Sequence, residues 1–290
     1  MSSHWYDPIE KRLVSTVPSA NGKGLVKATL THAKKFGYFP GATTYLDVVH
    51  KWGLFNWAKK QVALAGAYNK DDKLREENPE AWAAKTLDIA QDLMDQAPDL
   101  GSKIHRAIER YNKALVSGDP FKTVDPEIEP YLLCYRKLMH REEITPLQSE
   151  FVVADKEFGI AGLVDLHAHI GREKNAIIDF KTTKFKYGKN NDEPWVDISH
   201  GAQLASYAMA FDRSLKRPLI NIYMDTTPTK DSTQIKTLIH LWDNNAELYK
   251  LFQMCKNLWC SKIGPGQGWW PEQYYLPPKS PSNMIQGSIL

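Results

Sequence analysis

Hydrophobic and polar positions alternate with a period of two along two neighbouring stretches in the middle of the chain. The first stretch covers residues 161–170 and the second covers residues 176–183. The apolar positions that share a face are Val164, Leu166, Ala168 and Ile170 in the first stretch and Ala176, Ile178 and Phe180 in the second. The intervening residues 171–175 are polar and begin with a glycine, which is typical of a turn. This pattern predicts a β-hairpin whose strands each have one apolar and one mainly polar face.

Elsewhere, apolar residues recur with the spacing of helices or in short runs typical of buried strands. The predicted helices start near residues 43 and 54 and cover residues 79–96, 100–115, 126–142, 199–213 and 245–260. Further strands are predicted over residues 147–156, 219–224 and 234–242, with a second hairpin over residues 10–30. Residues 69–78 form a polar interruption between helices, and residues 187–194 are expected to form a loop.

Composition adds little to this picture except by exclusion. The chain has 290 residues, of which 42% are hydrophobic and 24% charged, as in ordinary soluble globular proteins. No run of about 18 apolar residues is present, which excludes a transmembrane helix. The N-terminal residues lack the pattern of a secretory or transit peptide. We therefore expect a cytoplasmic protein of a bacterium or of a phage-infected host, without a membrane partner.

The three cysteines, Cys134, Cys255 and Cys260, are too few and too irregularly spaced for a disulfide framework. They are also too few for an iron–sulfur cluster or a zinc site with four thiolate ligands. We expect them to be buried thiols without a chemical role.

The net charge of +3 is only mildly basic, but its distribution is uneven. Basic residues gather on the predicted hairpin and just after it, at Arg172, Lys174, Lys181, Lys184, Lys186 and Lys189. Such a cluster is compatible with an ordinary solvated surface and also with the approach of a polyanion.

Charged residues on the polar side of the hairpin suggest chemistry. Asp165 and Asp179 are separated by an even number of residues, which predicts that they lie on the same face and close together. Lys181 shares that face. Two adjacent carboxylates repel each other unless a cation lies between them, and carboxylate oxygens suit Mg²⁺ or Mn²⁺. The alternative is a surface hairpin with an ion pair between Lys181 and either aspartate.

Two predicted helices carry further polar residues at regular spacing. His105 lies at the edge of the apolar stripe of helix 100–115, where a lone histidine is most often structural. Gln203 and Tyr207 lie one turn apart on helix 199–213.

Taken in order, these residues and elements resemble the PD-(D/E)xK nuclease superfamily, and specifically its RecB-type exonucleases, including phage and mitochondrial members. The matching residues are Gly101 and His105, Glu150, Gly162 and Asp165, Asp179 to Lys181 with Thr182 and Thr183, and Gln203 and Tyr207. Residues 42–58 also look like a segment that precedes the core in several phage and mitochondrial members. The resemblance covers roughly residues 43–242.

The resemblance implies an α/β (α+β) fold with a restriction-endonuclease-like core, in which helices flank a mixed β-sheet. Residues 98–262 would form this nuclease core. Residues 1–97 would form an N-terminal hairpin and a mainly helical elaboration that caps the cleft. Residues 263–290 would form a tail rich in proline, glycine and aromatic residues.

The resemblance also implies roles for individual residues. Lys181, Asp165, Asp179 and Glu150 would form the catalytic group. The metal ligands for Mg²⁺ or Mn²⁺ would be His105, Asp165, Asp179 and the backbone carbonyl of Phe180. Thr182 and Lys184 would bind DNA, and Gln203 and Tyr207 would bind the DNA backbone or hold Lys181 in place. His167 and His169 match no part of the family pattern and are expected to be solvated or to pack on the strand.

The activity implied is a metal-dependent DNA exonuclease of replication, recombination, repair or phage-directed DNA degradation, acting on single strands or duplex ends. The cysteines that bind an iron–sulfur cluster in some relatives are absent, so no cluster is expected. The sequence has no phosphate-binding loop of a helicase, so unwinding would need a helicase partner; a single-strand-binding or annealing partner is also compatible. The alternatives are an endonuclease on the same fold and a non-catalytic nucleic-acid-binding module.

Overall fold

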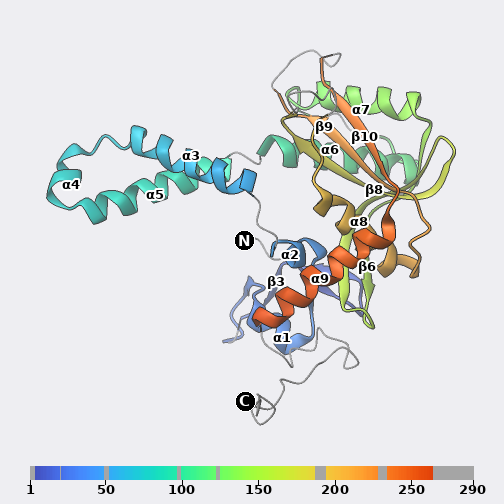
Figure 1. Ribbon diagram of the computed structural model, residues 1–290, viewed down its shortest axis with the longest axis horizontal. Coiled ribbons are helices and arrows are strands. Elements are labelled where there is room, and N and C mark those ends of the chain that lie inside the picture. Colours follow the sequence, from blue (N-terminus) through green and yellow to red (C-terminus); the bar gives the residue numbers. More distant parts are fainter. Residues whose placement is uncertain are drawn as a thin grey trace, which may run out of the picture.

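The core of the protein is a five-stranded mixed β-sheet. A computed structural model describes residues 4–19, 21–48, 52–96, 99–121, 125–186, 194–227 and 234–263. The strands lie in the order β10-β9-β8-β7-β6 (Figure 1). Their bounds are β6 Ile144–Asp155, β7 Ile160–Ile170, β8 Glu173–Thr183, β9 Leu219–Asp225 and β10 Thr237–Trp242. Neighbouring strands are antiparallel except β8 and β9, which are parallel. The predicted mixed sheet is confirmed.

Helices cover both faces of this sheet. Helices α6 (Asp99–Ser117) and α7 (Glu129–Arg141) pack on one face, against a core that includes Leu166, Ile178 and Ile222. Helices α8 (Ile198–Asp212) and α9 (Asn245–Ile263) pack against a second core that includes Ile177 and Leu219. Because β8 and β9 are parallel, the chain crosses over between them, and α8 lies in that connection. This arrangement matches the predicted α/β fold with helices on either side of the sheet.

The central hairpin agrees with the prediction that Asp165 and Asp179 lie close together. Leu166 pairs with Ile178, so the same register places Asp165 opposite Asp179 one pair further on. The structure adds that the face of β8 that carries Asp179 is not exposed to water at its centre, because residues 176–180 are all buried. The reason is that α8 and its core cover the side on which a two-stranded hairpin would meet water.

A small N-terminal unit packs beside the sheet. It contains a three-stranded sheet of β2 (Arg12–Val14), β1 (Trp5–Asp7) and β5 (Phe39–Pro40), and a hairpin of β3 (Thr16–Pro18) and β4 (Leu25–Lys27). It also contains the helices α1 (Leu30–Phe36) and α2 (Ala42–Leu46). The second predicted hairpin is confirmed in its inner part, β3 and β4, whereas β2 pairs with β1. The elements α1, β1 and β5 were not predicted. A bridge between Gly41 and Ala161 joins the unit to β7.

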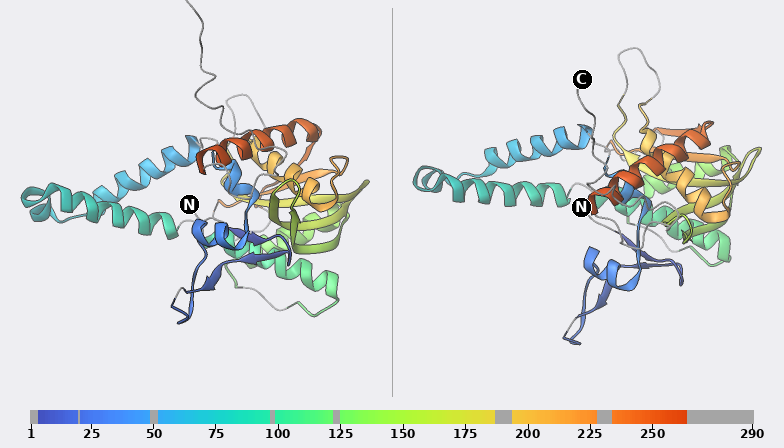
Figure 2. Two further views of the ribbon diagram at one scale, coloured as in Figure 1. Left: turned by 90° about the horizontal axis from the view of Figure 1, so that it is seen from below. Right: turned by 60° about the horizontal axis from the view of Figure 1, so that its bottom comes forward.

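Three helices form an elongated projection beside the core, as two different views show (Figures 1 and 2). They are α3 (Trp52–Tyr68), α4 (Asp72–Glu77) and α5 (Pro79–Gln96), which pack mainly on one another. The expected polar interruption at residues 69–78 was wrong in part, because it contains α4. Asp71 caps this helix by accepting a hydrogen bond from the Leu74 amide at 3.0 Å, which satisfies an otherwise free N–H group.

The remaining expectations concern features outside the sheet. All three cysteines are buried and unpaired, as predicted. None of the helices in the described part of the chain combines the length and the hydropathy needed to cross a bilayer. Most of the predicted loop at 187–194 and nearly all of the predicted tail at 263–290 lie outside the described residues. That residues 1–97 cap the cleft stays a prediction.

One glycine of β7 fixes how closely α8 approaches the sheet. A Cβ atom at Gly162 would lie 2.2 Å from Cε1 of the buried Tyr207 ring. Gly162→Ala is therefore expected to lower the free energy of unfolding by roughly 1–3 kcal/mol, the usual cost of overpacking a core. Urea unfolding of the parent and the variant measures this difference.

Gly66→Ala is the matched control for this prediction. The nearest atom to a Cβ at Gly66 is 3.9 Å away, and alanine favours the α3 helix over glycine. This control is expected to be at least as stable as the parent. A Gly162→Ala variant as stable as the control would contradict the proposed steric role of Gly162.

Candidate active site

The candidate site lies where β7 and β8 separate. The last regular pair of the two strands on this side is Leu166 with Ile178. Beyond it, the Asp165 carboxylate accepts a hydrogen bond from the Phe180 amide at 2.8 Å. The Asp165 side chain thus supplies the hydrogen-bond acceptor for the backbone N–H group of Phe180, which points toward β7. This places the Asp165 carboxylate in the gap between the two strands, beside Asp179.

Lys181 is held in a defined position by two partners. Its ammonium group lies 3.0 Å from Oδ1 and 2.8 Å from Oδ2 of Asp179, and it donates to Oε1 of Gln203 at 3.1 Å. The Gln203 amide in turn donates to the Tyr207 hydroxyl at 2.7 Å. The two α8 residues predicted from their one-turn spacing therefore orient Lys181. Whether they also contact DNA stays a prediction.

Asp179 is held from its other side by a residue of β9. Asn221 donates to Oδ2 of Asp179 at 2.8 Å, and its own oxygen accepts from the Trp242 indole N–H at 2.8 Å. Asn221 is fully buried. Neither Asn221 nor Trp242 was singled out from the sequence. The signal that was available is an asparagine between two isoleucines, Ile220 and Ile222, in the middle of β9.

Asp165 has fewer partners that favour its charge. Burial raises the pKa of the Asp165 carboxyl group well above its usual value, and the negative charge of Asp179 raises it further. The positive charge of Lys181 and the Phe180 amide oppose this shift without cancelling it. The site therefore contains two close carboxylates, and the negative charge of one of them, Asp165, is strongly disfavoured.

His105 approaches this pair from the other face of the sheet, on α6. Its Nδ1 atom lies 3.9 Å from Oδ2 of Asp165, and its side chain is 32% exposed. Burial lowers the pKa of the His105 imidazole, so the ring is neutral near pH 7 and available as a ligand. This proximity to Asp165 therefore supports a role for His105 in the site.

Gly101 explains how α6 comes so close to the sheet. A Cβ atom at Gly101 would lie 2.7 Å from Oγ1 of Thr182, so only glycine fits without a shift of Thr182. His105 follows one turn later on the same helix face. Thr182 is half-buried at this contact, whereas the Lys184 side chain is exposed.

Glu150 lies beside the site on β6. Burial raises the pKa of its carboxyl group to about 7, and the negative charges of Glu109 and Asp179 contribute to that increase. Its backbone has a φ of 50°, which is rare for a residue with a side chain. The catalytic role of Glu150 stays a prediction.

Two histidines on β7 and one tyrosine complete the surroundings. The His167 ring packs 5.2 Å from the Phe211 ring, and His169 Nδ1 accepts from the Asn175 amide at 3.1 Å. Both contacts support the expected structural roles. Tyr6 of β1 is also buried. Burial raises the pKa of its hydroxyl group, and the negative charges of Glu150 and Asp165 raise it further, because Tyr6 lies near both carboxylates. Tyr6 was not predicted as a neighbour of the site because it is far from Glu150 and Asp165 in the sequence.

The donor set suits a divalent cation, although the side chains are not arranged around one. Within the described residues, no three His, Cys, Asp or Glu side chains converge on a common point. Asp179 instead contacts Lys181 and Asn221, and Asp165 contacts the Phe180 amide. Two close carboxylates, one of them with its charge strongly disfavoured, beside a neutral imidazole nevertheless fit a hard cation. The assignment of the Phe180 carbonyl as a ligand stays a prediction.

Comparison with known proteins identifies one family. A family model described as the PD-(D/E)XK nuclease superfamily matches residues 73–268, which include every residue of the candidate site except Tyr6. No curated protein matches the chain.

Neutralising the two aspartates is expected to have opposite effects on stability. An Asp165→Asn side chain keeps an acceptor for the Phe180 amide but removes a charge that burial and Asp179 disfavour. Because the folded-state pKa of Asp165 is raised above its unfolded-state value of about 4, this group lowers the free energy of unfolding increasingly as the pH rises above that unfolded-state value. The variant should therefore be more stable than the parent at pH 7, by about 1 kcal/mol or more.

Asp179→Asn is the matched control, since it makes the same chemical change on the neighbouring strand. It removes the partner of the largely buried Lys181 ammonium and should cost roughly 1–2 kcal/mol. Urea unfolding at pH 7 with EDTA measures both effects. If Asp165→Asn unfolds at a lower urea concentration than the parent, the Asp165 charge is not a destabilising feature.

Proposed function

The chain belongs to the PD-(D/E)XK nuclease superfamily, and on this basis we propose that it is a divalent-metal-dependent exonuclease that hydrolyses phosphodiester bonds from DNA ends. The observation that carries this proposal is the position of Lys181, which Asp179 and Gln203 hold near the partly buried Asp165 carboxylate. A purely structural ion pair would not need the adjacent, poorly compensated carboxylate.

Members of this superfamily generally use divalent metals such as Mg²⁺. In this chain, His105, Asp165, Asp179 and the Phe180 carbonyl are the proposed ligands for Mg²⁺ or Mn²⁺. When bound, a divalent ion supplies a water of lowered pKa and offsets negative charge on the phosphate. Its binding would also offset the repulsion between Asp165 and Asp179.

Lys181 is proposed to act directly on the reacting groups. Its ammonium group is a compact positive charge that can position the attacking water or bind the scissile phosphate. Gln203 orients it and is itself held by Tyr207. Glu150 is proposed as an additional carboxylate of the site, and its pKa of about 7 lets it exchange a proton near neutral pH.

DNA is the proposed substrate, and contacts to phosphates would give little sequence specificity. Thr182 and Lys184 are the proposed DNA contacts near the cleaved bond, whereas Gln203 and Tyr207 are buried and are proposed to hold Lys181 in place. We propose residues 98–262 as the nuclease core and residues 1–97 as a region that restricts access to its cleft. Replication, recombination, repair or phage-directed DNA degradation are processes that require such an activity, and a helicase, annealing or single-strand-binding protein would supply suitable DNA.

Removing the Lys181 charge should slow cleavage without preventing metal binding. Lys181→Met is expected to reduce the cleavage rate by roughly 10²–10³-fold, the usual effect of losing one group that stabilises developing charge. The increase in Tm on adding Mn²⁺ should remain, because the carboxylates that bind the ion are still present. Gel assays with end-labelled DNA and thermal unfolding measure the two effects.

Lys216→Met is the matched control for this variant, because Lys216 is exposed and lies in the loop that follows α8. The control should cleave DNA at the rate of the parent. If Lys181→Met also cleaves at that rate, Lys181 has no direct part in the reaction.

The mode of cleavage is tested with two single-stranded substrates, one linear and end-labelled and the other covalently closed. With Mg²⁺ or Mn²⁺, the parent should convert the linear strand to mononucleotides and short oligomers and leave the circle intact. An Asp179→Ala variant should degrade neither.

Each other outcome selects a different function. Cutting of the circle as fast as the linear strand would favour an endonuclease. Binding of both substrates without cleavage of either would favour a non-catalytic nucleic-acid-binding module. Equal degradation by the parent and by Asp179→Ala would show that Asp179 is not a catalytic residue.

A further inference from the structure

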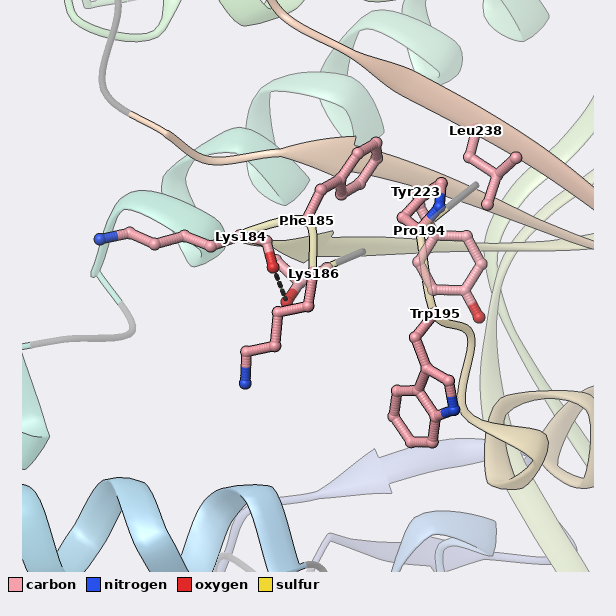
Figure 3. A pocket seen from close by; sticks show the side chains of 8 residues that line it. Lys184, Phe185, Lys186, Pro194, Trp195, Tyr223 and Leu238 are labelled. Atoms are coloured by element: carbon pink, nitrogen blue, oxygen red, sulfur yellow. Dashed lines mark hydrogen bonds between the residues drawn. The ribbon is translucent and has the colours of Figure 1, made fainter. Parts of the chain in front are cut away.

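A second site lies just beyond the end of β8, next to the candidate active site. It is a pocket of ≈ 100 Å³. Its walls include Lys184, Phe185, Lys186, Pro194, Trp195 and Tyr223 (Figure 3). These residues come from two segments that are adjacent in space, the extension of β8 and the approach to α8, with Tyr223 contributed by β9.

Trp195 is the unusual residue of this pocket. Its side chain is 73% exposed, whereas Trp5 and Trp242 in the cores are only 3% and 9% exposed. Its backbone is nevertheless held in place, because the Trp195 amide donates to the Lys186 carbonyl at 2.9 Å. An indole on a fixed backbone that contributes little to the core is available to a ligand.

Two lysines contribute positive charge to the pocket, and the carboxylates of Asp197 and Asp225 lie near its lining residues Tyr223 and Phe185. Lys184 and Lys186 are exposed, and no carboxylate in the described part of the chain forms an ion pair with either. The nearby Asp225 carboxylate already accepts from the amides of Phe185 at 3.3 Å and Thr227 at 3.0 Å. In Figure 3 the Lys186 and Trp195 side chains extend toward the same side of the pocket, whereas the Lys184 side chain extends in a different direction.

The pocket is close to the proposed reaction centre along the chain. Lys186 follows Lys181 by five residues, so their Cα atoms are separated by at most about 18 Å. Lys184 and Lys186 are therefore placed to meet a part of the same DNA strand that lies near, but outside, the cleaved bond.

We propose that this pocket binds one unpaired nucleotide of the DNA strand next to the cleaved bond. The base stacks on the Trp195 indole, and Lys184 and Lys186 bind the flanking phosphates. A base within a duplex is already stacked and paired, so this site selects DNA with a single-stranded segment. The inference rests on the proposed function and adds a substrate class to it.

Binding is tested by fluorescence anisotropy of a short labelled single strand and of the matching blunt duplex. The Lys181→Met background with EDTA keeps the DNA intact. Trp195→Ala should weaken single-strand binding by about tenfold or more, the scale of one base–aromatic stack, and should change duplex binding little. Trp195→Phe should retain most of the single-strand affinity.

Two further sets of variants separate stacking from other effects. Ile198→Ala is the matched control, since Ile198 is also exposed and lies three residues further along the chain, and it should bind like the background. Lys184→Ala and Lys186→Ala should weaken binding of both DNAs and reduce its dependence on salt. Single-strand binding by Trp195→Ala that equals that of the background would overturn the proposal.

An abasic nucleotide moved through the single strand locates the stacked base. At one position, the loss of affinity should match that of Trp195→Ala, and the two losses should not add when combined. If the affinity losses from the abasic nucleotide and from Trp195→Ala add at every position, the indole stacks on no base.

Cleavage measured in parallel with Lys181 intact separates this inference from the proposed function. Cleavage by the parent combined with binding that is independent of Trp195 would overturn the subsite alone. Binding of the single strand that depends on Trp195, without cleavage by the parent, would support the subsite and overturn the nuclease function.

Discussion

The repulsion between Asp165 and Asp179 is the constraint on which the rest of the site depends. The strand register brings the two carboxylates together, and burial makes their charges costly. The structure offsets this cost unequally. Asp179 contacts the Lys181 ammonium and the Asn221 amide, whereas the Asp165 carboxylate accepts a hydrogen bond from the backbone amide of Phe180 and lies 3.9 Å from His105 Nδ1. Asp165 is therefore the carboxylate whose negative charge is less well offset.

The arrangement of the sheet supplies these contacts. Asn221 reaches Asp179 only because β9 lies beside β8, and it is fixed by Trp242 of β10. Gln203 reaches Lys181 because α8 crosses over between the two parallel strands. Glycines set the distances: Gly162 lets Tyr207 of α8 approach β7, and Gly101 lets α6 approach Thr182. The family's glycine positions thus have a steric explanation in this chain.

Local patterns predicted the parts of the fold and site that depend on short stretches of sequence. The helix at 79–96 was predicted with the bounds it has, and the parity of Asp165 and Asp179 was sufficient to place them together. The short strands β1 and β5 were missed because they are stabilised by pairing with distant segments. Asn221 and Trp195 were missed for a similar reason: their neighbours are set by the order of strands and by the fold of the loop before α8.

The ion pair between Lys181 and Asp179 connects the resting structure to the proposed reaction. In the structure, the ammonium group offsets the charge of Asp179. With a divalent ion near the carboxylates, Asp179 would no longer depend on Lys181 for its partner, while Gln203 would still hold the ammonium group at the site. The same lysine would then be available to a phosphate without leaving its position. A residue that offsets the charge of Asp179 in this way also keeps the site ready for substrate.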